Sequence, residues 1–163
     1  MIERLIMISG GQTGADQGGL RAAKAAGVKT GGYAPKGWTT EEGPAPWLAD
    51  FGLKEHESAD YPPRTIANVK GAHATLWYGN PKSIGGRLTF QTLRRWELDG
   101  FVIVLNETAP EEVAAWMLEV IEFSSDGEIV FNVAGNRESK SPGIGALVEK
   151  HFGAVLALLK EKS

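Results

Sequence analysis

The amino-acid sequence predicts a single α/β domain, built as a doubly wound, mainly parallel sheet with helices on both faces. Short apolar runs alternate with helical segments along the chain, and the runs are continuous, as in parallel strands that are buried on both faces. The chain of 163 residues falls within the usual range of one domain. No internal repeat or linker divides it, so we expect residues 1–163 to fold together.

The individual elements follow from apolar periodicity and from glycine and proline breaks. The expected strands are residues 5–9, 29–33, 74–78, 101–105 and 128–133. The expected helices are residues 16–26, 64–71, 88–99, 110–124 and 144–160. Residues 34–48 contain several prolines and glycines, so we expect a long irregular loop of the kind that is often functional or mobile.

Composition excludes several classes of protein. The formal net charge is −3 and no dense block of Lys and Arg is present, which argues against general nucleic-acid binding. The chain has no cysteine, so disulfides and thiolate metal sites are excluded and a cytoplasmic location is expected. The apolar stretch that ends at Ile8 is too short for a membrane span. His56, His73 and His151 lie outside any metal-ligand spacing, so no metal site is expected.

The 21 glycines cluster in a few places, and three clusters follow a strand and precede a helix. These are residues 10–16, 79–86 and 134–143. Such loops lie at the carboxyl edge of a doubly wound sheet, where ligands bind. Each offers a helix N-terminus with unpaired N–H groups, which attract an anion. The sequence therefore predicts that a phosphorylated small molecule binds at this edge.

Several residues in these loops have a structural interpretation beside the ligand-binding one. Thr13 and Asp16 fit a helix capping box as well as they fit ligand contact. Arg87 and Arg137 are more often solvated charges when considered singly, but two arginines beside glycine loops favour phosphate contact. Lys36 is a weaker candidate of the same kind.

Familiar motifs of other families are missing from the sequence. No G-x-x-x-x-G-K-[ST] motif is present, which excludes a P-loop nucleotidase, and no G-x-G-x-x-G motif supports an ordinary NAD dehydrogenase. No G-x-S-x-G nucleophile elbow is present.

Longer motifs resemble the "putative molybdenum carrier" family, the circularly permuted YpsA branch of the Rossmann-like SLOG superfamily. The resemblance spans nearly the whole chain. It is carried by Ser9-Gly-Gly-Gln-Thr-Gly-Ala-Asp16, Gly32-Tyr-Ala-Pro-Lys-Gly-Trp38, Glu42-Gly-Pro44, Arg64-Thr65 with Asn68-Val69, Ala74-Thr-Leu76, Gly85-Gly86 with Thr89, and Asn132-Val-Ala-Gly-Asn-Arg-Glu-Ser139. The permutation implies that the last strand lies beside the first, which would bring the three loops together.

The resemblance and the loop analysis together give a set of expected ligand-binding residues. They are Gly10, Gly11, Gln12, Thr13, Gly14, Asp16, Lys36, Gly85, Gly86, Arg87, Thr89, Gly135, Asn136, Arg137 and Glu138. Two departures from the wider family matter. Asn136 stands where proline is frequent, and the glutamate of the related LOG phosphoribohydrolases has no counterpart after Thr89. The hydrolase activity is therefore not transferred to this chain.

The expected function is binding of a nucleotide or nucleotide-derived phosphate ligand, without demonstrated catalysis. One alternative is a hydrolase that cleaves a glycosidic or phosphate bond, with Asp16 and Glu138 as its carboxylates. A second alternative is a carrier of molybdenum cofactor, which rests on the family label alone. A homodimer is expected by analogy with related Rossmann-like proteins.

Overall fold

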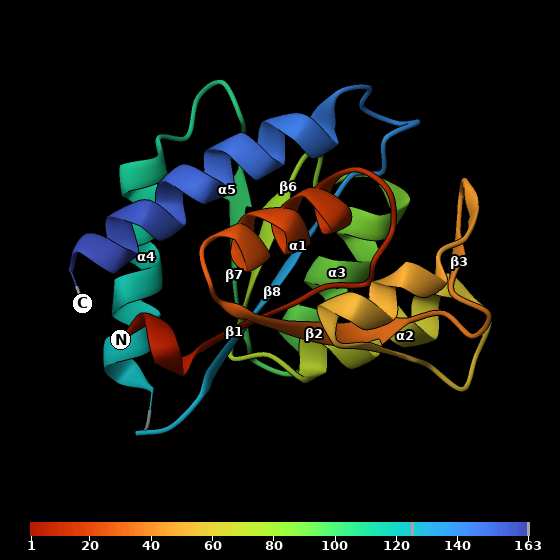
Figure 1. Ribbon diagram of the computed structural model, residues 1–163, viewed down its shortest axis with the longest axis horizontal. Coiled ribbons are helices and arrows are strands. Elements are labelled where there is room, and N and C mark those ends of the chain that lie inside the picture. The colour runs from red at the N-terminus through yellow and green to blue at the C-terminus, as the bar shows by residue number, and fades with distance from the viewer. Residues whose placement is uncertain (125, 163) are drawn as a thin grey trace.

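The five expected strands form, and with a sixth that was not expected, at Leu53–Glu55, they build a six-stranded parallel sheet in a computed structural model that describes residues 1–124 and 126–162 (Figure 1). The strands are β1 (Leu5–Ile8), β2 (Lys29–Ala34), β5 (Leu53–Glu55), β6 (Ala74–Tyr78), β7 (Asp99–Ile103) and β8 (Ile129–Gly135). Their order is β5-β2-β1-β8-β6-β7. The helices are α1 (Ala15–Ala25), α2 (Tyr61–Lys70), α3 (Ile84–Arg95), α4 (Pro110–Phe123) and α5 (Ile144–Glu161). The predicted fold class is confirmed.

The last strand lies beside the first, as the permutation requires. β1 and β8 pair in parallel, with Leu5 opposite Ile129 and Ile8 opposite Asn132. β8 also pairs with β6 on its other side. The segments that follow β1, β6 and β8 therefore meet at one edge of the sheet.

The two faces of the sheet differ in chemistry. One face carries the main apolar core, in which β1, β6 and β8 pack against α1, α4 and α5 through buried residues such as Met7, Phe131 and Phe152. The opposite face of the same strands lies toward α2 and α3. It carries the buried polar residues Thr75 and Asn132, together with Trp77. A doubly wound sheet needs apolar strands on both faces, so polar residues in these positions mark the face that bears the site.

The region expected to be irregular contains short regular elements. A two-residue antiparallel pair joins β3 (Thr39–Thr40) and β4 (Gly43–Pro44), and a 3₁₀ helix covers Pro46–Phe51. Leu48 of that helix packs with Leu20 and Leu53 in a second small core. The expectation of an irregular loop was wrong here, because local turn bonds and a small apolar cluster organise the segment. A further 3₁₀ turn, Ile2–Arg4, precedes β1.

Several boundaries also differ from the prediction, and α2, for example, begins at Tyr61 and not at 64. α3 begins at Ile84 and not at 88, because the Ser83 hydroxyl accepts a hydrogen bond from Gly86 N and caps the helix through its glycines. α3 ends at Arg95, and β7 covers Asp99–Ile103 where residues 101–105 were expected. Among the described residues, no helix combines the length and the apolar character that crossing a bilayer requires.

Candidate functional site

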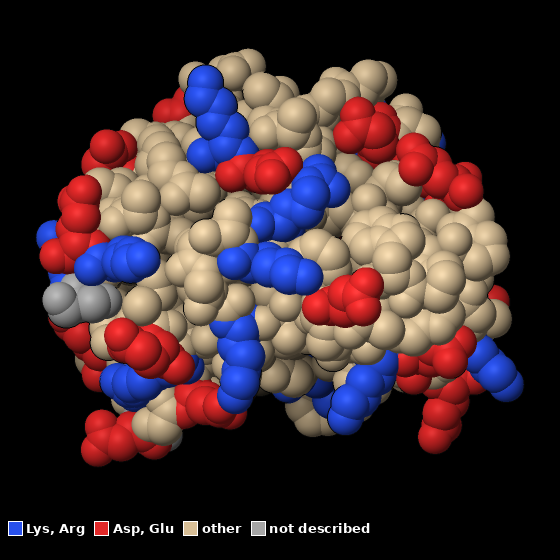
Figure 2. All heavy atoms as spheres, viewed as in Figure 1, with Lys and Arg blue, Asp and Glu red and all other residues tan. Residues whose placement is uncertain are grey.

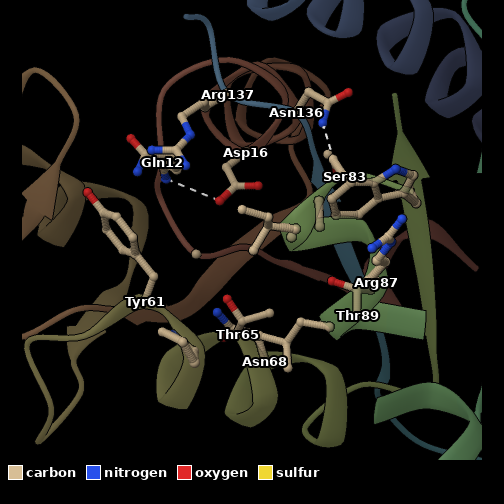
Figure 3. A pocket seen from close by; sticks show the side chains of 18 of the residues that line it. Gln12, Asp16, Tyr61, Thr65, Asn68, Ser83, Arg87, Thr89, Asn136 and Arg137 are labelled. Carbon is tan, nitrogen blue, oxygen red and sulfur yellow. Dashed lines mark hydrogen bonds between the residues drawn. The ribbon is translucent and has the colours of Figure 1, made fainter. Parts of the chain in front are cut away.

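A cavity of about 580 Å³ opens at the carboxyl edge of the sheet, between the ends of β1, β6 and β8 and the helices α2 and α3 (Figure 3). This volume lies within the range of roughly 300–1,000 Å³ that is typical of small-molecule sites. Its walls include the apolar parts of Tyr61, Pro62, Trp77, Ile84 and Leu88. The cavity thus follows the less apolar face of the sheet rather than the main core.

Basic side chains dominate the charges around the cavity. Arg64, Lys82, Arg87, Arg137 and Lys140 line it. The only carboxylate among its described lining residues is Asp16. On the face of the molecule shown in Figure 2, by contrast, basic and acidic side chains are interspersed. The lining itself carries an excess of positive charge, which favours an anionic ligand.

Asp16 and Arg64 form a buried ion pair in the cavity wall. Arg64 Nη1 lies 3.4 Å from Asp16 Oδ2, and the same carboxylate oxygen accepts a hydrogen bond from Gln12 N. Burial raises the pKa of Asp16 to about 6, against the opposing effects of the Arg64 charge and the Gln12 amide. A Cβ on Gly10 would overlap Arg64 Nη1, so this position needs glycine to let the guanidinium rest against the backbone.

The loop after β1 does not present a row of free amides. Gln12 N donates to Asp16, and Thr13 N donates to the Gln12 side-chain oxygen. Ala15 N donates to the carbonyl of Asn136. The expectation that this loop offers its amides to an anion was therefore wrong for these three groups. Side chains close the loop upon itself, and Asp16 acts within the loop as the acceptor.

Two consecutive unpaired amides lie at the start of α3. Ser83 accepts from Gly86 N, while the N–H groups of Ile84 and Gly85 have no hydrogen-bond partner among the described residues. The N-terminus of this twelve-residue helix faces the cavity, since Ser83, Ile84 and Gly85 all line it. This helix end supplies a second source of positive potential.

Asn136 holds the three loops together. Its backbone N donates to Tyr78 O, and its carbonyl accepts from Ala15 N. Its side chain accepts from Asn80 N and donates to Ser83 Oγ, a bond drawn in Figure 3. The residue is buried, and these four bonds span the segments after β1, β6 and β8. Its position beside the cavity is thus mainly structural.

Arg137 lies at the rim beside a carboxylate from the β3–β4 turn. Its Nε is 4.0 Å from Glu41 Oε2, and its side chain is 37% exposed. Glu41 also accepts hydrogen bonds from Thr13 Oγ1 and from the amide and hydroxyl of Ser139. Burial alone would raise the pKa of the Glu41 carboxyl, but the bonds from Ser139 and Thr13 outweigh it and lower that pKa.

Glu138 contacts the start of α5 and not the cavity. Its carboxylate accepts hydrogen bonds from Gly143 N and Gly145 N at the start of α5. It does not line the cavity. Two amide donors at a helix N-terminus occupy its carboxylate, which suits capping and not proton transfer.

Some residues of the cavity lining carry buried polar atoms without partners. Among the described residues, four buried side-chain polar atoms have no hydrogen-bond partner: Arg64 Nε, Trp77 Nε1, Thr89 Oγ1 and Asn132 Oδ1. All four residues line this cavity. Because these four atoms are closed to solvent, they lie behind the surface of the cavity and not on it.

Of the fifteen residues expected from the sequence, nine line the cavity. They are Gly10, Gln12, Asp16, Gly85, Arg87, Thr89, Gly135, Asn136 and Arg137. Six do not: Gly11, Thr13, Gly14, Lys36, Gly86 and Glu138. Lys36 sits in an exposed turn, and Gly14 packs against the Asn136 and Glu138 backbone.

Sequence reasoning also missed part of the lining. The missed residues are Tyr61, Pro62, Arg64, Thr65, Asn68, Trp77, Lys82, Ser83, Ile84, Leu88, Asn132, Ala134 and Lys140. The motif Arg64-Thr65 with Asn68 could have indicated some of these lining residues. An asparagine at 132, within an apolar strand, could have done the same.

Known proteins give a consistent match. The model of the circularly permutated YpsA SLOG family matches residues 7–156 of this chain. A crystal structure named "putative molybdenum carrier protein" from Syntrophus aciditrophicus SB is similar, with a TM-score of 0.82 and 29% sequence identity. The alignment covers 95% of this chain and 96% of that one. Among curated proteins, no sequence matches this chain.

Proposed function

Because this chain belongs to the circularly permutated YpsA SLOG family, we propose that its cavity binds a phosphorylated small molecule of the nucleotide type. The family and the solved neighbour share the fold over almost the entire chain. The ligand itself is inferred from the chemistry of the cavity.

One observation carries the proposal: five basic residues line a cavity whose only described carboxylate, Asp16, is already paired with Arg64. Lys82, Arg87, Arg137 and Lys140 have no comparable partner within the lining. Arg137 has Glu41 beside it, outside the lining, so Lys82, Arg87 and Lys140 are the basic groups in clear excess, and they favour a ligand with a multiply charged phosphate. The free amides of Ile84 and Gly85 support the same site, because a helix N-terminus attracts phosphate.

The apolar walls favour an organic group attached to that phosphate. Trp77, Leu88 and Pro62 offer little to inorganic phosphate, and such walls are typical of small-molecule sites. A phosphate joined to a planar or apolar body uses both parts of the lining.

The contacts of the two candidate carboxylates favour binding over hydrolysis. Glu138 is held by the amides of α5, outside the lining. Asp16 lines the cavity and has a raised pKa, but it already accepts from Gln12 N and pairs with Arg64. Hydrolysis would need a second group beside Asp16 to share the proton transfer, and no other described lining residue is a carboxylate or a histidine.

Carriage of molybdenum cofactor is the second candidate, and the name of the similar crystal structure favours it. The cofactor contains a phosphorylated pterin, which the lining fits as well as it fits a nucleotide. Arg87, Arg137 and Lys140 would hold the phosphate, and Trp77 and Leu88 would flank the ring. The chain contains no cysteine, so metal ligation by thiolates of the protein plays no part in this alternative.

Native mass spectrometry of freshly purified protein tests the proposal. We expect an added mass that disappears on denaturation and that contains phosphorus. The Arg87→Ala/Arg137→Ala variant should lose that mass, while Arg21→Ala, which removes a charge paired with Glu149 outside the cavity, should keep it. Retention of the mass by the double variant, or a wild-type protein that neither carries nor takes up phosphate compounds, would refute the proposal.

The homodimer and the cytoplasmic location stay predictions. Size-exclusion chromatography with light scattering tests the first, and fractionation of cells tests the second.

A further inference from the structure

We infer that the protein forms a homodimer through the free edge of its sheet, where β7 of one copy pairs antiparallel with β7 of a second copy. The inference goes beyond the proposed function and does not depend on the ligand. It starts from the strand order β5-β2-β1-β8-β6-β7, which leaves β7 at one edge (Figure 1). A strand at an edge presents unpaired backbone groups to any strand that approaches it.

One hydrogen bond shows which backbone groups of β7 point outward. Ile103 O accepts from Gly79 N, which directly follows β6. Because successive residues of a strand direct their N–H and C=O groups alternately to its two sides, those of Gly100 and Val102 point away from β6. Among the described residues, no backbone group of another segment bonds to these outward groups. They are therefore available to another strand.

The two edges of the sheet differ in how they are protected. β5, at the opposite edge, has three residues, and Lys54 and Glu55 among them are charged and exposed. Short length and charge protect a strand edge from pairing. β7 has five residues, and its one charged residue, Asp99, stands at the first position. Phe101 and Val102 in its middle are half-buried and apolar, so β7 lacks the protection that β5 has.

The outward groups of β7 match those of a second β7 in one antiparallel register. When the two-fold axis passes between Phe101 and its copy, Gly100 faces Val102 of the second copy and Val102 faces Gly100. The outward N–H and C=O groups of both strands then bond to one another. The two Phe101 residues form a non-hydrogen-bonded pair, whose Cα atoms lie about 4.5 Å apart. Each Asp99 lies opposite Ile103, so the two carboxylates stay at opposite ends of the pair.

Exposed apolar side chains gather around the same strand. Trp96 precedes β7, Val104 follows it directly, and both are exposed. Phe123 of α4 is 91% exposed and lines a hollow together with Asp99 at the start of the strand. Clustered apolar residues on a surface mark an interaction site. In the antiparallel register the start of one strand lies beside the end of the other, so the apolar groups at the two ends approach one another.

These observations favour a second copy over a strand of another protein. The outward groups are complementary to themselves about one axis, and that axis keeps the like charges apart. A two-fold axis also repeats each contact, so a modest surface on one chain is used twice. The cavity at the carboxyl edge stays open in this dimer, because Trp96, Phe123 and residues 99–103 do not line it.

Val102→Pro tests the inference through the backbone. Proline lacks the outward N–H, and it is tolerated on edge strands where that group faces away from the sheet. Sedimentation equilibrium should give wild type a mass of twice the 17.5 kDa of one chain. The Kd of dimerisation should rise about tenfold or more in the variant, because each copy loses one hydrogen bond. Trp47→Lys removes an exposed aromatic from the 3₁₀ helix beside β5, and it should dimerise as wild type does.

Phe101→Cys tests the register. The chain contains no cysteine, so a disulfide in this variant joins two copies at residue 101. Cα atoms about 4.5 Å apart fall within the range of roughly 4.4–6.8 Å that a disulfide spans. Oxidised glutathione should therefore produce a disulfide-linked dimer of Phe101→Cys, and none of Trp47→Cys, whose residue lies at the other edge.

Wild-type protein that stays monomeric at every concentration overturns the inference. Val102→Pro protein that folds and still dimerises as wild type does overturns it as well. If the melting curve shows that Val102→Pro does not fold, the cysteine variant decides, and absence of its linked dimer refutes pairing along β7. None of these outcomes bears on phosphate binding, because β7 does not line the cavity.

Discussion

Arg64 and Asp16 face each other across the wall of the cavity, 3.4 Å apart, and Arg64 rests on the backbone of Gly10. The contact joins α2 to the loop after β1, two segments that are far apart in the sequence. Burial lowers the pKa of the arginine as it raises that of the aspartate, so both charges are held at a desolvation cost. An ion pair kept at such a cost beside a cavity suggests a role in shaping the site.

The first prediction concerns pH. The Asp16 pKa of about 6 in the folded chain lies above the value near 3.8 of the free side chain. The folded state therefore binds the proton more tightly, and the stability linked to Asp16 is complete below about pH 4 and declines as the pH rises through 6. Denaturant unfolding from pH 4 to 7.5 should show wild type losing stability relative to Asp16→Asn mainly between about pH 4 and pH 6, with little further change above that. A constant difference between the two proteins, or a difference that favours wild type as the pH rises, would contradict this.

The second prediction concerns Gly10. Alanine there would overlap Arg64 Nη1 and push the guanidinium away from Asp16. We expect Gly10→Ala to lower the free energy of unfolding by about 1–3 kcal/mol, the cost of leaving a buried polar group unpaired. Gly153→Ala is the control, since a Cβ in that position of α5 meets nothing within 4 Å. It should stabilise the protein by about 0.5–1 kcal/mol, the helix preference of alanine over glycine. Thermal melts that rank the two variants alike would overturn the account of Gly10.

The third prediction separates Glu138 from the site. Because its carboxylate accepts from Gly143 N and Gly145 N, Glu138→Ala should cost about 0.5–2 kcal/mol of stability, as loss of a helix cap does. Ligand affinity measured below the melting transition should equal that of wild type. Glu149→Ala, which breaks only the exposed pair with Arg21, should change stability by less than about 1 kcal/mol. A Glu138→Ala protein that melts as wild type does but no longer binds the ligand would show that Glu138 belongs to the binding site.

The fourth prediction concerns the ion pair between Glu41 and Arg137. Neutralising the carboxylate in Glu41→Gln should free Arg137 for the ligand and raise affinity for phosphate compounds roughly two- to fivefold, the scale of an exposed ion pair. Glu42→Gln removes the same charge from the same turn, where the side chain is exposed, and should change affinity little. If both variants bind alike, the effect is one of general charge. If Glu41→Gln binds more weakly than wild type, Glu41 supports the site and does not compete with the ligand.

Most of the fold was predictable from the sequence because local signals agreed with the tertiary structure. The apolar run at residues 5–8 and the break at Gly10 were enough for β1, and the resemblance placed β8 beside it. The start of α3 was not predictable in the same way. Gly85 and Gly86 indicate a loop by propensity, but the Ser83 cap and the Pro81 backbone packed against Gly86 hold them in a helix.

The site was predictable where it lies on glycine loops and not where it lies within helices and strands. Gly135, Arg87 and Arg137 were found because they stand beside turn signals. Trp77 and Asn132 were missed because alternation alone cannot say which face of a strand meets a cavity. The prediction of free amides after β1 was wrong for the amides that donate hydrogen bonds to acceptors such as Asp16. This pairing depends on tertiary geometry, which the sequence does not reveal.

The central claim is that the basic rim of the cavity binds the phosphate of a small ligand. Calorimetric titration of wild type, Arg137→Ala and Arg21→Ala with nucleoside monophosphates at low salt tests it most directly. Arg137 lines the cavity and is partly exposed, so its loss should weaken binding about tenfold or more while the melting temperature of the free protein stays nearly unchanged. Arg21→Ala, with its charge outside the cavity, should bind as wild type does. Equal affinity for Arg137→Ala and wild type, or equal weakening in both arginine variants, would contradict the claim.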